Sequence, residues 1–274
     1  MNYPYEREFT TYCKNEKNYS DLTMLIVNKS LTNFWKYFDA GNDAGTPLSE
    51  IKATDIQNYL NNLETNLKLK ENTINKYLSH IRVYFTFLYS HHFIKDYPMV
   101  EINGRKFNRK HTYVINWMDK LPDIAKIPNI HPETVFMMLG ISLGYLPDQV
   151  LKLRYNDVAT RINSYTLRQY LKNHVNFSID ENPYILGKKY GGYYASDFHL
   201  AQKVRPDREL IGMDITLQNL RLSYVYSILS RKDLTDEDLL RILKVDIKSL
   251  VYYRQNMMRY NTLIEFSLDS DYEV

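Results

Sequence analysis

The stretch NTINKYLSHIRVYFTFLYSHHFI, residues 72–94, has the clearest helical pattern in the chain. Its apolar residues recur every three or four positions, which places them on one face of a helix. The opposite face carries hydrogen-bonding side chains and no acid, which suits a helix lying against nucleic acid, although a solvated face can have the same composition. The apolar stripe is Ile74, Leu78, Ile81, Phe85 and Leu88, and the polar face is Asn75, Ser79, Arg82 and Thr86, with Lys76 and His80 beside them.

The composition is that of an ordinary globular protein with one large domain or two modest ones, since 274 residues are 44% hydrophobic and 24% charged. Nine glycines and nine prolines are few for this length and favour helices over many short strands. The single cysteine, Cys13, excludes an internal disulfide and zinc-finger spacing, and the histidines show no metal-ligand spacing. We therefore expect neither a metal nor a cofactor.

The sequence gives no sign of a membrane segment. No apolar run approaches the ~20 residues that span a bilayer. The first residues, MNYPYEREFT, lack the basic start and apolar stretch of a signal peptide. We expect a cytoplasmic protein with no membrane partner.

Positive charge is concentrated in residues 103–112, NGRKFNRKHT, which contain four basic residues and no acid. The segment follows the helical part, residues 1–102, and precedes a second part, residues 113–274, whose last ten residues form an acidic tail at 265–274. The pattern predicts an interdomain linker, which either remains solvated or contacts nucleic acid. The basic residues are Arg105, Lys106, Arg109 and Lys110.

The helix at 72–94 resembles the last helix of the SAM-like core-binding domain of tyrosine recombinases and phage integrases, commonly written T-x-N-R-x-L-S-x-L-R-x-F-F-x-F-L. Four later stretches resemble motifs of that family's catalytic domain in the same order, so the resemblance covers nearly the whole chain. It implies a mainly α, two-domain clamp: a helical core-binding domain and a mostly helical catalytic-like domain with a reduced β-sheet. The four stretches are residues 132–158, 182–210, 215–229 and 239–257.

The resemblance also implies a chemistry. In the family a tyrosine attacks a DNA phosphodiester, two arginines neutralise the phosphate, a lysine protonates the leaving oxygen and histidines flank the site. Here the segment GYLPDQVLKLRYNDV places Leu146 where the first arginine stands, and the helix ITLQNLRLSYVYSIL keeps the second, Arg221. Other positions of the pattern hold Gln218 and Val245 for the two histidines, Leu222 after Arg221, and Tyr253 or its neighbour Tyr252 for the nucleophile.

The lysine of the family site lies on a β-hairpin, and the segment of this sequence at the corresponding place is short. Residues 159–182 fill the gap, and SYTLRQYLKNHV within them has a helical pattern and no hairpin turn dipeptide. We expect the hairpin to be shortened or lost. Lys188 and Lys189, in the later GKKYGG segment, are candidate phosphate contacts or a plain loop.

These substitutions lead to the hypothesis of an inactive scaffold, with Arg221 and Tyr253 as vestigial residues. We expect a sequence-specific double-stranded DNA-binding protein, with self-association on repeated or palindromic sites. Its expected role is that of a repressor of a prophage or mobile element, and one specific candidate is a regulator similar to the master repressors of SPβ-type prophages. The bias towards Tyr, Asn, Lys and Ile is typical of a low-GC Gram-positive host. The alternatives are a diverged but active recombinase and a helical accessory factor that binds no DNA. The expected DNA contacts are Asn75, Lys76, Ser79, His80, Arg82, Arg105, Lys106, Arg109, Lys110, Lys188, Lys189 and Arg221.

Overall fold

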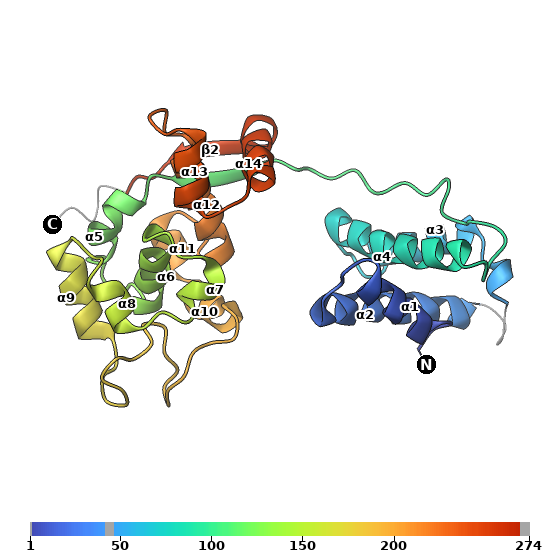
Figure 1. Ribbon diagram of the computed structural model, residues 1–274, viewed down its shortest axis with the longest axis horizontal. Coiled ribbons are helices and arrows are strands. Elements are labelled where there is room, and N and C mark those ends of the chain that lie inside the picture. Colours follow the sequence, from blue (N-terminus) through green and yellow to red (C-terminus); the bar gives the residue numbers. More distant parts are fainter. Residues whose placement is uncertain (1, 42–46, 269–274) are drawn as a thin grey trace. The chain divides into compact units, whose positions relative to one another are not determined.

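The computed structural model describes residues 2–41 and 47–268. The chain divides into two compact units, residues 1–108 and 109–274 (Figure 1). Helices contain 57% of the residues and strands 5%, so the expected mainly α fold with a reduced β-sheet is confirmed. The boundary between the units lies inside the segment 103–112 that the charge pattern marks as a linker.

The first unit is a helical bundle in which α4 packs against the other three helices. The apolar stripe predicted for α4 is buried at all five positions, and Tyr84 and Phe87 extend the buried face. The Tyr84 hydroxyl donates to the carbonyl of Pro4 (2.8 Å), which fixes the N-terminal segment on this helix. The elements are α1 (Glu6–Asn15), α2 (Asp21–Gly41), the 3-10 turn η1 (Leu48–Glu50), α3 (Ala53–Thr65) and α4 (Glu71–Ser90).

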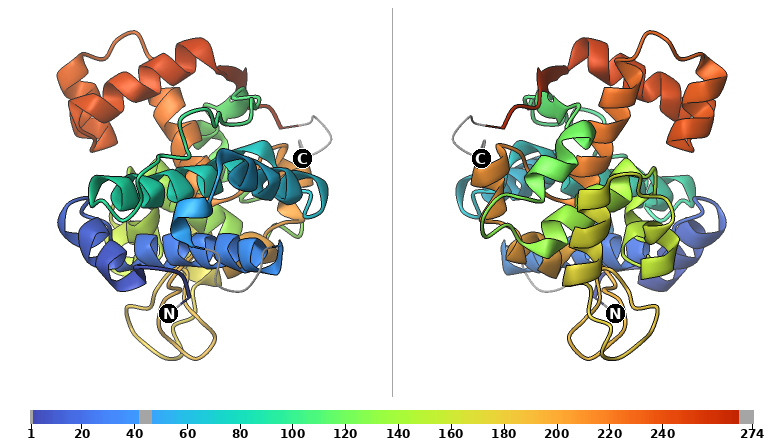
Figure 2. Two further views of the ribbon diagram at one scale, coloured as in Figure 1. Left: turned by 90° about the vertical axis from the view of Figure 1, so that its right-hand side faces the viewer. Right: turned by 90° about the vertical axis from the view of Figure 1, so that its left-hand side faces the viewer.

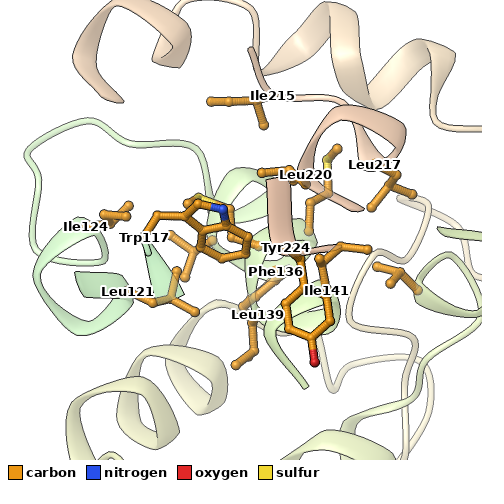
Figure 3. Packing of buried hydrophobic residues seen from close by; sticks show 14 of the residues in the cluster. Trp117, Leu121, Ile124, Phe136, Leu139, Ile141, Ile215, Leu217, Leu220 and Tyr224 are labelled. Atoms are coloured by element: carbon orange, nitrogen blue, oxygen red, sulfur yellow. The ribbon is translucent and has the colours of Figure 1, made fainter. Parts of the chain in front are cut away.

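The second unit is built around α6 (Pro132–Ser142) and α12 (Leu217–Leu229), which pack against each other and are apolar on nearly every side. Figure 3 shows Trp117, Phe136 and Leu220 meeting in this core. The Trp117 indole N–H donates to Ser223 Oγ (2.8 Å), so the one polar atom of this large side chain is satisfied inside the core.

The other elements of the second unit surround these two helices. They are β1 (His111–Ile115), η2 (Met118–Lys120), α5 (Leu121–Ile124), α7 (Pro147–Val150), α8 (Tyr155–Ala159), α9 (Tyr165–His174), α10 (Phe198–Lys203), α11 (Asp207–Ile211), α13 (Asp236–Leu243), α14 (Ile247–Arg259) and β2 (Asn261–Glu265).

In the described part of the chain the sheet is a single parallel pair, β1 with β2, in register from His111 opposite Asn261 to Ile115 opposite Glu265. The strand that leaves the linker therefore pairs with the strand that follows α14, as Figure 1 shows. The Glu265 carboxylate accepts hydrogen bonds from the Asn116 side-chain amide at 2.9 and 3.0 Å. Of the acidic tail predicted at 265–274, residue 265 thus belongs to β2, and residues 269–274 lie outside the described residues.

The segment where the family hairpin was expected to be shortened or lost is mainly helical at its start. Helix α9 forms as predicted, and the Ser164 hydroxyl caps it by accepting from the Leu167 N–H. Between α9 and α10 the chain runs as extended loops that project from the helices of this unit (Figure 2). The only strand-like contacts described there are two isolated bridges, Arg154 with Tyr184 and Gly187 with Tyr193.

Candidate nucleic-acid interface

The predicted polar face of α4 exposes Lys76 and Ser79, but His80 points elsewhere. His80 Nδ1 lies 2.8 Å from the hydroxyl of Ser30, a buried residue of α2. Burial lowers the pKa of His80, and Lys76 lowers it further, which favours the neutral ring. The His80 ring nitrogen thus joins two helices of the bundle, and a contact of this side chain with DNA stays a prediction.

Asn75 and Arg82, also expected to face DNA, bind the chain that leaves the bundle. The Asn75 side-chain amide donates to the Arg105 carbonyl (2.8 Å), and its oxygen accepts from the Arg105 N–H (2.7 Å). An Arg82 Nη donates to the Ile102 carbonyl (2.6 Å). A Cβ on Gly104 would lie 2.8 Å from the Asn75 oxygen, so this close approach needs glycine. Asn75 thus positions the linker, and Arg82 shares that role.

Arg105 does not extend from the linker as a free cation either. Its Nε donates to Glu64 (2.7 Å) and its Nη2 to Asn61 (2.5 Å), both on α3. The side chain is only 22% exposed. Glu64 thus pairs with the charge of Arg105, and a contact of this arginine with phosphate stays a prediction.

The second half of the linker is exposed. Lys106, Arg109 and Lys110 are all exposed in the residues described. The Arg109 guanidinium lies 5.9 Å from the ring centre of Tyr260, the residue that follows α14. The backbone at His111 is fixed to the same place, since its N–H donates to the Tyr260 carbonyl (3.0 Å). Positive charge is thus held beside the end of α14.

A substitution at Asn75 tests whether its hydrogen bonds to Arg105 hold the linker on α4. Asn75→Ala removes both hydrogen bonds to Arg105, so residues 103–106 should become a better protease substrate. We expect trypsin to cut after Arg105 or Lys106 several times faster than in the unmodified chain. Asn72→Ala, on the exposed side of the same helix, is the control. Equal cleavage rates in the two variants would show that the Asn75 contacts do not hold the linker.

Lys188 and Lys189 lie on a minimal hairpin. The Lys188 N–H donates to the Gly192 carbonyl and the Gly191 N–H to the Lys188 carbonyl, each at 3.0 Å. The Lys189 ammonium stays 5.4 Å from the ring of Tyr190, which is 86% exposed. The two lysines also line a cavity beside α9. They remain candidate phosphate contacts.

Three positions where the family pattern has catalytic side chains hold groups unsuited to that role. Leu146 precedes α7, and its backbone N–H donates to the Gln149 side chain (3.0 Å) and so is not free to donate to a phosphate. Gln218 is exposed on the first turn of α12. Val245 packs against the hydrophobic core. Neither a leucine nor a valine can donate a hydrogen bond or carry charge.

Arg221 differs from these, because it is buried and only partly satisfied. Its side chain is 5% exposed, and Nη2 donates to the Leu243 carbonyl at the end of α13. Nη1 is buried with no hydrogen-bond partner among the residues described. Burial lowers the pKa of Arg221, against which Tyr224 and Tyr253 raise it. A buried donor without a partner costs about 1–3 kcal/mol, more when charged, so this group is poised for an anion.

The two candidate nucleophiles are placed differently. Tyr252 is 61% exposed on α14. Tyr253 is half-buried, and its ring stands edge-on to Tyr226, with ring centres 6.2 Å apart. Of these two tyrosines, Tyr253 is the one that raises the pKa of Arg221, so it is the better match to the family's tyrosine.

Comparisons with known proteins find relatives of the first unit by sequence. Residues 7–92 match the family described as "Phage integrase, N-terminal SAM-like domain". Tyrosine recombinase XerC of Lactobacillus delbrueckii subsp. bulgaricus is 32% identical over 106 residues, which cover 38% of this chain and 35% of the relative. XerC of Lactobacillus leichmannii is 31% identical over the same length. The matched stretch thus spans about a third of these curated relatives.

Solved structures extend the likeness to the second unit. The structure of a lambda integrase dimer bound to a COC′ core site has a TM-score of 0.64 at 12% identity, covering 96% of this chain and 98% of that one. The Tn1549 transposon integrase in complex with a circular intermediate DNA has a TM-score of 0.61 at 11% identity, covering 93% and 98%. Residues 7–92 thus resemble the SAM-like domain of phage integrases, and the chain as a whole has the fold of the lambda and Tn1549 integrases.

Two further observations concern metal ions and membranes. Among the described residues no cluster of three or more His, Cys, Asp or Glu side chains could hold a metal ion. In the same ranges no helix combines the length and apolar character needed to cross a membrane.

Arg161 and Lys244 are two cations near Leu146 that the sequence patterns did not predict as site residues. Both lie over the ring of Tyr145, the residue before Leu146, at 4.7 and 5.4 Å from its centre. A signal for Lys244 was present in the sequence, because LKVD has lysine where the family pattern L-G-H has glycine. Arg161 has no motif, and only the fold brings it to Tyr145.

Proposed function

We propose that this chain binds specific sites on double-stranded DNA without cutting them, and that it represses transcription from a prophage or mobile element. The observation that carries the proposal is Leu146, at the position where the family holds the scissile phosphate with its first arginine. Because leucine is apolar, the negative charge of a phosphorane-like transition state would lack one of the two arginines that stabilise it in the family. Arg221 remains available to bind a phosphate.

The positive residues left exposed by the fold supply the rest of the interface. Lys76 and Ser79 on α4, the linker residues Lys106, Arg109 and Lys110, and the hairpin lysines Lys188 and Lys189 are the candidate contacts. The relatives solved with DNA support this use of the scaffold. We expect the protein to act in the cytoplasm on the nucleoid, with pairs of molecules on repeated or palindromic sites.

Genome-wide DNA immunoprecipitation of the full chain tests this function. A repressor should enrich a small set of promoter-proximal sites, and deletion of the gene should raise the transcripts that begin there. Enrichment only at the ends of a mobile element would instead favour a recombinase. Failure to bind any duplex, even at low salt, would favour an accessory factor that works through protein contacts.

A diverged but active recombinase is the second candidate, and one observation favours it. Arg221 and Tyr253 are both present and interact electrostatically in the second unit. The Discussion gives the measurement that separates this candidate from the first.

Replacing the lysines on α4 and in the linker should change the salt dependence of DNA affinity. Lys76→Gln with Lys106→Gln removes two exposed cations, neither of which is ion-paired among the described residues. If each contacts a phosphate, the plot of log K against log salt should become shallower by about 0.9 per contact, or roughly two units together. Arg105→Gln, at a cation already paired with Glu64, is the control and should change the slope little. An unchanged slope in the double variant would remove these lysines from the interface.

A further inference from the structure

Three cations of the second unit gather around two tyrosine rings next to Leu146. Arg161 and Lys244 both lie over Tyr145, and the Arg221 guanidinium lies 5.4 Å from the ring centre of Tyr224. The segments that carry the three cations are adjacent, because Arg221 Nη2 donates to the carbonyl of Leu243, the residue before Lys244. A Cβ on Gly144, the residue before Tyr145, would lie 3.6 Å from the Tyr224 hydroxyl.

Burial raises the pKa of Tyr224, while Arg221, then Arg161 and Arg231, oppose that rise. We call Arg161, Arg221 and Lys244 the cation cluster. Its members come from three separate segments, the end of α8, the middle of α12 and the end of α13.

Within residues 2–41 and 47–268, no ion pair neutralises the charge of the cation cluster. Among the described residues no carboxylate lies within 4.0 Å of any of the three cations. Arg161 donates to a backbone carbonyl, that of Leu143 (2.9 Å). Arg221 Nη1 is buried and unpartnered, as described above. Arg221 is the buried member of the cluster, while Arg161 and Lys244 are exposed. A buried cation is normally paired, so the unpartnered Nη1 of Arg221 indicates a missing anion.

Lys244 is held in a backbone conformation that lysine does not favour. It ends α13 with φ 53° and ψ 48°, in the left-handed region, and its N–H donates to the Leu240 carbonyl. Glycine is the usual residue there, because a Cβ crowds the following carbonyl. The lysine side chain at this position therefore lowers the stability of the fold, and strain of this kind is common at functional sites.

We propose that Lys244 and Arg161, positioned on the ring of Tyr145, bind a DNA phosphate together with Arg221 and so replace the cation that Leu146 lacks. The inference rests on the proposed DNA-binding function. The ligand is a backbone phosphodiester, which accepts hydrogen bonds from Arg221 and Arg161 and pairs with the ammonium of Lys244. The site binds its phosphate and leaves it intact.

Lys244→Gly tests the inference, because it should change stability and binding in opposite directions. Glycine relieves the left-handed strain, so the melting temperature should rise. Affinity for a short duplex of fixed arbitrary sequence at low salt should fall on the order of tenfold, with a salt slope shallower by about 0.9. A variant that is more stable and binds less cannot owe its loss to unfolding. Lys172→Gln, at an exposed lysine on α9, is the control for charge alone.

Two more variants complete the test. Arg161→Gln should weaken binding by a similar factor, and adding Leu146→Arg to Lys244→Gly should recover most of the lost affinity by placing a guanidinium beside Tyr145. If Lys244→Gly and Arg161→Gln bind the duplex as tightly as the unmodified chain, the cation cluster is not a phosphate site, although DNA binding stands. If the unmodified chain binds no duplex at low salt, the proposed function fails, and this inference with it.

Discussion

Replacing Asp207 with alanine is expected to destabilise the second unit more than any surface substitution would. Asp207 is 1% exposed, at the start of α11. Its carboxylate accepts from the His131 N–H (3.0 Å), lies 2.7 Å from His131 Nδ1 and accepts from the Thr134 hydroxyl. One buried acid therefore caps the N-terminus of α6, the central helix of the unit.

The size of the effect follows from what alanine leaves behind. Thr134 is fully buried, so its hydroxyl would lose its partner in the core, and the first turn of α6 would lose its acceptor. Removing one partner of a buried charged network costs about 3–5 kcal/mol. Urea unfolding of the full chain should show this loss, with Asp207→Asn retaining part of it because an amide oxygen still accepts.

Asp214→Ala is the matched control for Asp207→Ala. Asp214 pairs with Arg208 at 2.9 Å, but its side chain is 52% exposed. An exposed pair contributes about 0–1 kcal/mol, so this variant should unfold close to the unmodified chain. Equal losses in the two alanine variants would mean that Asp207 does not cap α6 as the structure shows.

The second large effect concerns cleavage. In this family a phosphodiester is cut by a tyrosine whose attack is assisted by paired arginines, histidines and a lysine. Loss of one preorganised donor lowers a rate by ~10²–10³-fold. Here Leu146, Gln218 and Val245 occupy three of those positions, and the described segment between α8 and α10 forms no extended hairpin. The losses do not simply add, but Arg221 and Tyr253 alone are not expected to cut DNA.

A single reversion should not restore that activity. Leu146→Arg restores the first arginine of the family pattern, while Gln218 and Val245 still cannot replace the histidines. We expect this variant to bind DNA more tightly and to leave it uncut. The contrast separates the binding role of the cation cluster from catalysis.

The sequence pattern predicted those elements whose signals are local. The stripe Ile74, Leu78, Ile81, Phe85 and Leu88 is buried in α4 because helical spacing alone decides which face the core covers. The helical pattern within residues 159–182 likewise became α9. The order of the family motifs extended this to the fold of the whole chain.

Contacts between distant segments were beyond that approach. The parallel pairing of β1 with β2 joins strands of five residues from opposite ends of the second unit. The sequence of neither strand indicates which strand it pairs with. Asn75 looked like a DNA contact because its face of α4 is polar, yet the chain at Gly104 and Arg105 returns to cover it. Composition likewise marked Arg105 as basic but could not show Glu64 beside it.

The most direct measurement of the central claim uses a duplex with a nick that traps a covalent tyrosine intermediate. The full chain should shift such a duplex in a native gel, and the complex should dissociate completely in denaturant. Tyr253→Phe and Tyr252→Phe should bind as tightly as the unmodified chain. A complex that survives denaturant, and disappears in either tyrosine variant, would show that the protein cuts DNA and would contradict the account of a binding scaffold without cleavage.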